Sequence, residues 1–266
     1  MKFLDYINNW SKNFKSIKID DTYLDDSMRK HVETCNHCSG FISLHTICQD
    51  KFLSYLFVEK FGWPIPKQYF NGFAKDFPED LLNNNIVIKA THGCSSREVI
   101  CIKNSVDFFT KEEISGNSLI EKFNNKFIIS EELLIDKEYN HDIPLDFKCF
   151  VFNGNIELLC ICETSLENKR KHAWYDKNMN LLGSLIKNVP IFKESDKYLP
   201  SPEEFNQMKD FCKDFRIFNN LFLRIDFYIT KKGIVFGEFT PHPGGGKGYS
   251  DKFLNILDKL MIDYKI

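Results

Sequence analysis

Apolar residues recur with helical spacing in four parts of the chain, which predicts four amphipathic helices. The expected helices span residues 3–17, 50–62, 201–215 and 252–264. At the start of the third helix, Ser201 is a good N-cap and Pro202 fits the first turn. In the first helix, the shared apolar face consists of Phe3, Leu4, Ile7, Trp10, Phe14 and Ile17.

Between these helices the pattern changes to short runs of β-branched and aromatic residues, which is typical of strands. The expected strands are 86–89, 99–102, 127–134, 146–152, 156–162, 221–229 and 234–239. The turn Lys231-Lys232-Gly233 joins the last two into a hairpin. Because helices and strands do not alternate regularly, the expected class is α+β with mostly antiparallel sheets.

Composition narrows the class of protein. With 43% hydrophobic residues in 266, the chain can bury a substantial core. A net charge of −2 provides no basic surface for nucleic acid. No apolar run approaches the roughly 18 residues of a membrane helix, and the first helix lacks the apolar core of a secretory signal. Nine cysteines, an odd number, favour free thiols and a cytoplasmic location.

The first candidate site is the strand ending at Lys89 together with the loop that follows. A loop of small hydroxyl residues around a glycine can surround phosphate oxygens with backbone N–H groups, while the lysine supplies positive charge. The alternative is an ordinary turn. The candidate phosphate-binding residues are Lys89, His92, Gly93, Ser95 and Ser96.

The second candidate site is the predicted C-terminal hairpin. Arg224 and Asp226 share a strand face because side chains alternate, and Glu238 shares a face with Thr240 on the partner strand. Two carboxylates beside a phosphate-binding loop suit Mg²⁺. The alternative is a structural Arg–Asp ion pair on a solvated sheet face.

The third candidate site follows the strand that contains Glu131. The backbone where this strand ends, at Leu133 and Leu134, can pair with an adenine edge, and an acidic side chain such as that of Glu138, four residues beyond, can accept from ribose hydroxyls, as carboxylates do in other nucleotide sites. Alone, this segment is an ordinary acidic loop.

Taken in order, these motifs resemble the ATP-grasp superfamily, and most closely the TupA-like ATP-grasp family of cell-surface polymer synthesis, over roughly residues 45 to 250. The shared motifs are Asp50-Lys51, 62–66, 87–96, 131–138, 146–154, 223–228 and 237–245. The resemblance implies an ATP-grasp fold, in which two α+β subdomains clasp ATP. It divides this chain into a short N-terminal helical region (1–72), a lid subdomain (73–137) and a C-terminal subdomain with the metal site (138–266).

The resemblance also implies roles for individual residues. It implies phosphate binding by Lys51 and Lys89, adenine binding by Glu131 with the Leu133 and Leu134 backbone, and ribose binding by Glu138. Mg²⁺ ligands would be Asp226 and Glu238, with Thr240 where many ATP-grasp ligases have asparagine; Arg224, Lys89 and Lys148 would be catalytic.

The implied activity is an ATP- and Mg²⁺-dependent ligase that activates a carboxylate as an acyl phosphate and transfers it to an amine. The carboxylate would belong to a uronic-acid or glutamyl unit of a surface polymer. The alternatives are a kinase that phosphorylates a hydroxyl on the same scaffold, and a nucleotide-binding module without turnover. No nucleic-acid partner is expected, and contact of the first helix with a membrane surface is the alternative to its packing on the protein.

Three features of the sequence are not explained by this function. Cys35-Asn36-His37-Cys38 has zinc-like spacing but no second matching pair, so a reduced, partly buried cluster is favoured over zinc. Other metal-binding side chains lie nearby in the sequence: His31, His45 and Cys48. His92 and His242 each lie beside a glycine-rich loop, where either could contact phosphate, relay a proton or only hydrogen-bond a neighbour. The run Lys169 to His172 is interpreted as a solvated loop, with phosphate or an anionic substrate as the alternative contact.

Overall fold

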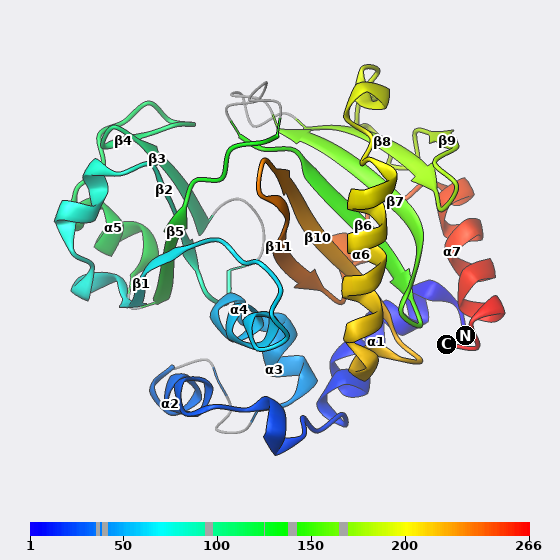
Figure 1. Ribbon diagram of the computed structural model, residues 1–266, viewed down its shortest axis with the longest axis horizontal. Coiled ribbons are helices and arrows are strands. Elements are labelled where there is room, and N and C mark those ends of the chain that lie inside the picture. Colours follow the sequence, from blue (N-terminus) through cyan, green and yellow to red (C-terminus); the bar gives the residue numbers. More distant parts are fainter. Residues whose placement is uncertain (36–37, 39–41, 94–97, 125, 138–142, 165–169) are drawn as a thin grey trace. The chain divides into compact units, whose positions relative to one another are not determined.

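The computed structural model describes residues 1–35, 38, 42–93, 98–124, 126–137, 143–164 and 170–266 (Figure 1). The chain divides into two compact units. Among the described residues, unit 1 comprises 1–16, 135–137, 143–164 and 170–266, and unit 2 comprises those between 17 and 134. Of the expected N-terminal region 1–72, residues 1–16 therefore belong to unit 1 and the remainder to unit 2.

Unit 2 is built on an antiparallel sheet with the strand order β1-β5-β2-β3-β4. Its strands are β1 (Gln68–Phe73), β2 (Ile86–Ala90), β3 (Val99–Lys103), β4 (Val106–Asp107) and β5 (Phe127–Glu132). Its helices are α2 (Asp26–Thr34), α3 (Leu44–Gln49), α4 (Lys51–Glu59) and α5 (Gly116–Phe123). Ile86 and Ile88 of β2 pack with Leu119 and Phe123 of α5 in one hydrophobic cluster. Because side chains alternate along a strand, Lys89 lies on the opposite face.

Unit 1 is built on a second antiparallel sheet with the order β11-β10-β6-β7-β8-β9. Its strands are β6 (Asp146–Phe152), β7 (Asn155–Thr164), β8 (Arg170–Asp176), β9 (Leu181–Gly183), β10 (Phe222–Thr230) and β11 (Gly233–Thr240). Its helices are α1 (Phe3–Lys15), α6 (Pro202–Asp214) and α7 (Asp251–Asp263).

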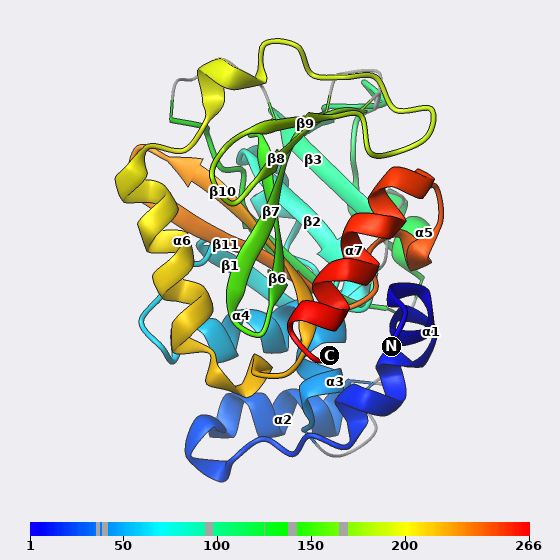
Figure 2. The same cartoon turned by 90° about the vertical axis from the view of Figure 1, so that its right-hand side faces the viewer.

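Helices α6 and α7 cover opposite faces of the unit 1 sheet (Figures 1 and 2). Phe211 of α6 contacts Phe227 of β10 with ring centroids 4.9 Å apart. Phe253 of α7 contacts Trp174 of β8 and Phe150 of β6, at 4.5 and 5.6 Å. Phe150 is paired with Arg224 in the sheet, and paired residues point to the same face. The sheet face that α7 covers therefore also carries the polar side chains of the candidate metal site.

Helix α1 packs on unit 1 through its apolar face, as expected. Phe3 and Phe14 are fully buried, and the Phe3 ring lies 4.9 Å from that of Phe222. The expected face is wrong in two positions: Leu4 is 38% exposed, and Ile17 lies beyond the end of α1, in unit 2. Tyr6 is buried instead, and its hydroxyl donates to the Phe222 carbonyl. The face that would meet a membrane surface is therefore covered by the protein's own core.

The expected α+β class with antiparallel sheets is confirmed, because every pairing between these strands is antiparallel. Ser201 caps α6 as expected, since its side chain accepts from the Glu204 N–H and Glu204 accepts from the Ser201 N–H. The interpretation of the basic run as a solvated loop is wrong. Arg170 to His172 form the start of β8, which is paired along its length with β7.

The sequence-based reading did not anticipate α2, α3, α5, β1, β4, β8 and β9. Asp25, Ser43 and Ser115 cap the three helices, each accepting from a backbone N–H three residues later. Within the described residues, no helix is long and apolar enough to cross a membrane.

Candidate functional site

The candidate metal residues are brought together by strand register. Asp226 is paired with Glu238 of β11 and with Lys148 of β6, and Arg224 is paired with Thr240. A bulge immediately after Asp226 shifts the register for the rest of the hairpin. These side chains therefore emerge from three neighbouring strands on one face, as the predicted hairpin required.

The Arg224 guanidinium binds the acidic side chains directly. Its Nε donates to Asp226 Oδ1 at 2.6 Å, and its Nη2 donates to Asp226 Oδ2 at 2.7 Å. The same Nη2 lies 2.9 Å from both Glu238 Oε1 and Thr240 Oγ1. The Thr240 hydroxyl in turn donates to Glu238 Oε1 at 2.9 Å. One cation thus fixes the geometry of the three expected metal ligands.

Lys148 binds the same carboxylate from the other side. Its Nζ donates to Asp226 Oδ2 at 2.8 Å and to Asp146 Oδ2 at 2.9 Å. Asp146 is a member of the site that the sequence-based candidates did not include. Its position two residues before Lys148 on the same strand is the signal that could have identified it.

His172 is a second residue that the sequence-based candidates did not include. It is paired with Cys162 of β7, which is paired with Asp146 of β6, so His172 lies on the face that carries Lys148. Within the described residues, neither ring nitrogen of His172 has a hydrogen-bond partner. Because the sequence predicted a solvated loop here, His172 was not among the predicted site residues. We call Asp146, Lys148, His172, Arg224, Asp226, Glu238 and Thr240 the strand-face cluster.

Burial and neighbouring charges set the ionisation of this cluster. Burial alone would lower the pKa of Lys148, but the charges of Asp146 and Asp226 raise it above its usual value. The pKa of Arg224 is likewise raised, because Asp226 and Glu238 outweigh its burial. Burial and the charge of Lys148 lower the pKa of His172 to about 4. His172 is therefore neutral near pH 7, beside two permanent cations.

The donor set of the strand-face cluster fits a magnesium ion. Mg²⁺ prefers oxygen ligands. The oxygen atoms of Asp226, Glu238 and Thr240 lie close together, because all three side chains accept hydrogen bonds from Arg224. The cluster contains three carboxylates and two permanent cations, which leaves one negative charge for a divalent cation to offset.

The candidate nucleotide residues of unit 2 centre on a buried ion pair. Lys89 Nζ lies 2.5 Å from Glu131 Oε1, and the two side chains are 10% and 4% exposed. Lys89 also donates to the Tyr55 hydroxyl of α4 at 3.1 Å. Strand register explains the pair, because Lys89 is opposite Ile129 and Val87 is opposite Glu131 in adjacent strands. Tyr55 was absent from the sequence-based candidates.

Lys51 and the loop after β2 are joined by two hydrogen bonds. The Lys51 ammonium donates to the Gly93 carbonyl, and the Lys51 N–H donates to the Thr91 carbonyl at 2.9 Å. A Cβ added at Gly93 would lie 3.2 Å from the Ala90 carbonyl oxygen. Lys51 and Gly93 are therefore neighbours at the start of α4, and their binding of phosphate stays a prediction.

The structure describes some of the remaining candidate residues and not others. The Leu133 N–H donates to the Asn85 carbonyl at 3.2 Å, and Leu134 is the last residue of this part of unit 2. Ser95, Ser96 and Glu138 lie outside the described residues. His242 stacks on Trp10 of α1, with ring centroids 4.6 Å apart and an interplanar angle of 10°. Burial and the charge of Arg224 lower its pKa.

Comparisons with known proteins identify relatives of the chain. The profile described as TupA-like ATP-grasp matches residues 43–263. Among curated proteins, none matches.

Similar solved structures include D-alanine–D-alanine ligase from Bacillus anthracis, at 17% identity and a TM-score of 0.49, covering 83% of this chain and 66% of that one. D-alanine–D-alanine ligase from Helicobacter pylori has 13% identity and a TM-score of 0.47, with coverages of 83% and 59%. The ATP-grasp ligase PsnB, solved with its minimal precursor, has 12% identity and a TM-score of 0.46, with coverages of 83% and 61%. The chain spans less than two thirds of the length of these structures.

Proposed function

The chain belongs to the TupA-like ATP-grasp family, and from this premise we propose that it is an ATP- and Mg²⁺-dependent ligase that joins a carboxylate to an amine. The α+β ATP-grasp fold expected from the sequence follows from the same membership. The reaction, its substrates and the roles of individual residues are the proposal.

The observation that carries the proposal is the arrangement around Arg224. A solvated Arg–Asp ion pair would involve two side chains, whereas Arg224 binds Asp226, Glu238 and Thr240 together, and Lys148 holds Asp226 from the other side. The Asp226 side chain is only 4% exposed, but that of Glu238 is 37% exposed. A buried, preorganised charge network with one accessible carboxylate suits binding of a cation and phosphate better than scaffolding.

Each half of the proposed machinery has a role in binding Mg-ATP. Lys51 and Lys89 would bind phosphate oxygens, and the Leu134 N–H with the neighbouring carbonyls would pair with adenine. Glu131 would act through Lys89, since its carboxylate is bound to that ammonium. The expectation that Glu138 binds ribose belongs to the same proposal. Asp226, Glu238 and Thr240 would hold Mg²⁺, which supplies charge neutralisation for the phosphate oxygens when bound.

In the proposed reaction, a carboxylate oxygen attacks the γ-phosphorus and the bond to the β,γ-bridging oxygen breaks, so ADP leaves with the electron pair. The amine then attacks the acyl carbon, loses a proton, and displaces inorganic phosphate. The protein contributes mainly position and charge. Arg224 and Lys148 would stabilise negative charge that develops on the reacting oxygens, because both remain protonated at accessible pH.

Membership of the TupA-like ATP-grasp family supports the proposed substrate class, because the resemblance is to proteins of cell-surface polymer synthesis. We propose a uronic-acid or glutamyl unit of a surface-polymer precursor as the source of the carboxylate, and a cytoplasmic reaction that draws on cellular ATP.

The experiment that tests this function measures ADP formation with Mg-ATP, candidate carboxylates and candidate amines. Wild-type protein should release ADP only when both substrates are present. Glu238→Gln keeps the shape of the side chain but removes its charge, so ADP formation should fall roughly a hundredfold with normal folding. Glu203→Gln, at an exposed position on α6, is the matched control and should behave as wild type.

Other outcomes would contradict the ligase. ADP release that needs no amine and leaves phosphate on a substrate hydroxyl would favour a kinase. ATP binding without ADP release would favour a nucleotide-binding module. Loss of folding in Glu238→Gln would favour a structural ion pair.

A further inference from the structure

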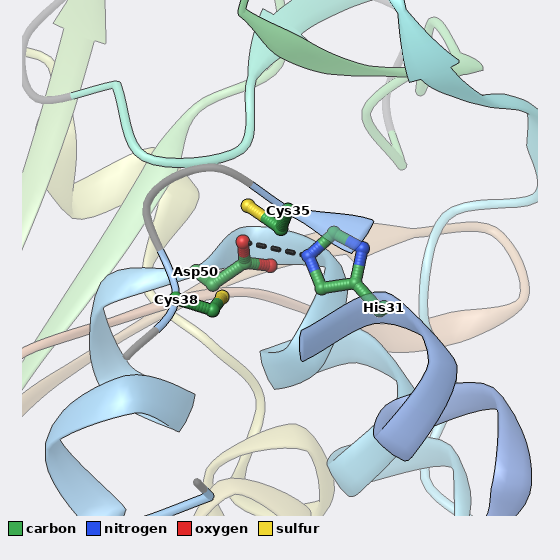
Figure 3. A group of neighbouring side chains, drawn as sticks. All are labelled: His31, Cys35, Cys38 and Asp50. Carbon is green, nitrogen blue, oxygen red and sulfur yellow. Dashed lines mark hydrogen bonds and ion pairs between the residues drawn. The ribbon is translucent and has the colours of Figure 1, made fainter. Parts of the chain in front are cut away.

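Side chains capable of binding a metal converge in unit 2, outside the strand-face cluster (Figure 3). His31 belongs to α2, Cys35 is its C-cap, Cys38 follows three residues later, and Asp50 is the N-cap of α4. One ligand atom from each lies within 4.8 Å of those of the others. Figure 3 shows the two sulfur atoms on either side of the Asp50 carboxylate, with the His31 ring facing the same carboxylate.

A fifth side chain, His92, points into the same group. Its Nε2 lies 3.5 Å from Cys35 Sγ, 3.7 Å from Cys38 Sγ and 3.3 Å from Asp50 Oδ2. The sequence places His31 near the Cys-x-x-Cys pair but contains no second matching pair. The partner residues instead come from α2, from the start of α4 and from the loop after β2. We call His31, Cys35, Cys38, Asp50 and His92 the thiol–imidazole cluster.

The three separations that involve His92 fit a tetrahedral metal site. With Zn–S bonds of about 2.3 Å and Zn–N bonds of about 2.0 Å, adjacent ligand atoms of a zinc tetrahedron lie about 3.3 to 3.8 Å apart. The distances from His92 Nε2 to Asp50 and to the two thiols, 3.3, 3.5 and 3.7 Å, fall in this range. Soft thiolates combined with imidazole select zinc over the magnesium expected in the strand-face cluster.

Burial argues against a solvated group of acidic side chains. The His31 and Asp50 side chains are 1% and 0% exposed, and Cys35 is also buried. His31 Nε2 lies 2.9 Å from Asp50 Oδ2, and Asp50 Oδ1 accepts from the Leu53 N–H. The Asp50 carboxylate is therefore held in place with one oxygen directed into the cluster, as a preorganised ligand requires.

We propose that the thiol–imidazole cluster binds a structural zinc ion through Cys35, Cys38 and His92, with the fourth ligand supplied by the buried His31–Asp50 pair. The ion connects the end of α2 to the start of α4 and to the loop after β2. His92 then anchors this loop instead of contacting phosphate. The inference depends on these contacts alone and does not require the proposed ligase activity.

The first test is the metal content of the purified protein, prepared without a polyhistidine tag. Wild type should retain about one zinc ion per chain after dialysis, as a closed structural site does. The double variant Cys35→Ser/Cys38→Ser should lose at least about nine tenths of it, because hydroxyls replace both thiolate ligands. Cys212→Ser is the matched control, since Cys212 is an equally buried thiol on α6 of unit 1, and it should retain zinc.

The second test remains informative if the double variant folds poorly. Zinc-depleted wild-type protein is titrated with CoCl₂, whose absorption reports ligand type and geometry. The account predicts intense tetrahedral d–d bands and a thiolate-to-cobalt charge-transfer band, which should weaken by about half in each single variant, Cys35→Ser and Cys38→Ser. Circular dichroism confirms that each single variant is folded.

Three results would overturn the proposal. Wild type that takes up no more zinc from ZnCl₂ than the double variant has no site. Cobalt spectra of an octahedral, oxygen-ligated ion would exclude the two thiolates. A Cys35–Cys38 disulfide in metal-free protein purified under reducing conditions would assign the pair to redox chemistry instead.

Discussion

At the scale of single residues, the buried pair of Lys89 and Glu131 determines how the phosphate assignment has to be tested. Replacing Lys89 alone would leave the Glu131 carboxylate buried without its ion-pair partner, which costs about 3–5 kcal/mol. The informative comparison is therefore between Glu131→Gln and the double variant Lys89→Met/Glu131→Gln. Both lack the buried carboxylate charge, and only the second lacks the ammonium.

We expect the double variant to bind Mg-ATP about ten- to a hundredfold more weakly than Glu131→Gln. One charge-assisted hydrogen bond to phosphate accounts for roughly 1.5–3 kcal/mol of binding free energy. Isothermal titration calorimetry of the two variants measures the difference. Equal affinities would remove Lys89 from the nucleotide site.

A second prediction at this scale concerns the neutral imidazole of His172. Its folded-state pKa of about 4 is below the usual unfolded value of about 6.5, so between these pH values the unfolded chain binds more protons. The stabilising contribution is complete above pH 6.5 and is lost as the pH falls towards 4. Denaturant unfolding from pH 4 to 7 should therefore show a wild-type stability that rises relative to His172→Gln, by at most roughly 3 kcal/mol.

The test uses the difference in unfolding free energy between wild type and His172→Gln, because other groups titrate in the same pH range in both proteins. A difference in unfolding free energy that stays constant from pH 4 to 7 would mean that His172 titrates normally in the folded state.

At the scale of elements, the hairpin of β10 and β11 places the proposed metal ligands, and Gly237 is the glycine of this hairpin that has the closest neighbours. A Cβ at Gly237 would lie 3.0 Å from the Asp226 carbonyl oxygen and 3.0 Å from the Tyr228 ring. Gly237→Ala should therefore displace the backbone of Asp226 by a few tenths of an ångström. We expect about tenfold slower ADP formation, because catalysis is sensitive to such displacements, and a loss of about 1–3 kcal/mol in stability.

The matched control is Val235→Ala, which removes buried methyl groups from the same strand without a backbone clash. It should destabilise the protein while leaving the rate per folded molecule unchanged. An unchanged rate in Gly237→Ala would show that the placement of Asp226 is not critical.

The elements that could be predicted from the sequence are those with a strong local signal. The hairpin was predictable because two alternating strands flank Lys231-Lys232-Gly233, and Gly233 adopts a φ of 104° that favours glycine. Helix α3 was not, because its six residues are too few to establish a period. Strand β8 was obscured by its charged first residues, although Ala173 to Tyr175 are buried.

The candidate site was predictable where its residues share a strand or a hairpin. Asp226 and Glu238 come together through pairing that periodicity alone indicates. The contact of Lys89 with Tyr55 depends instead on the packing of α4 against a strand more than thirty positions away, which no local pattern encodes. The same limit explains the thiol–imidazole cluster, whose members come from three separate segments.

At the scale of the whole molecule, the proposed roles are divided between the two units. The residues proposed for adenine and phosphate belong to unit 2, and the strand-face cluster belongs to unit 1. A variant in either group should therefore slow the complete reaction, but only the unit 2 variants should act mainly through nucleotide affinity. The net charge of −2 gives the molecule no general attraction for anionic substrates, so their binding has to come from local groups such as Arg224 and Lys148.

The central claim is that a carboxylate is activated as an acyl phosphate, and trapping with hydroxylamine tests it most directly. Hydroxylamine is a small, strong nucleophile that replaces an unidentified amine and converts an acyl phosphate into a hydroxamate. The assay would screen uronic acids and glutamyl compounds with Mg-ATP and score ADP and hydroxamate together. Arg224→Ala should reduce hydroxamate formation more than ATP binding, because its proposed contact is with charge that develops during the reaction.

The account predicts a carboxylate that gives ADP and hydroxamate in equal amounts with the wild-type protein, and neither product above background with Glu238→Gln. A compound that drives ADP release and becomes phosphorylated on a hydroxyl, with no hydroxamate at any hydroxylamine concentration, would contradict the ligase and establish the kinase.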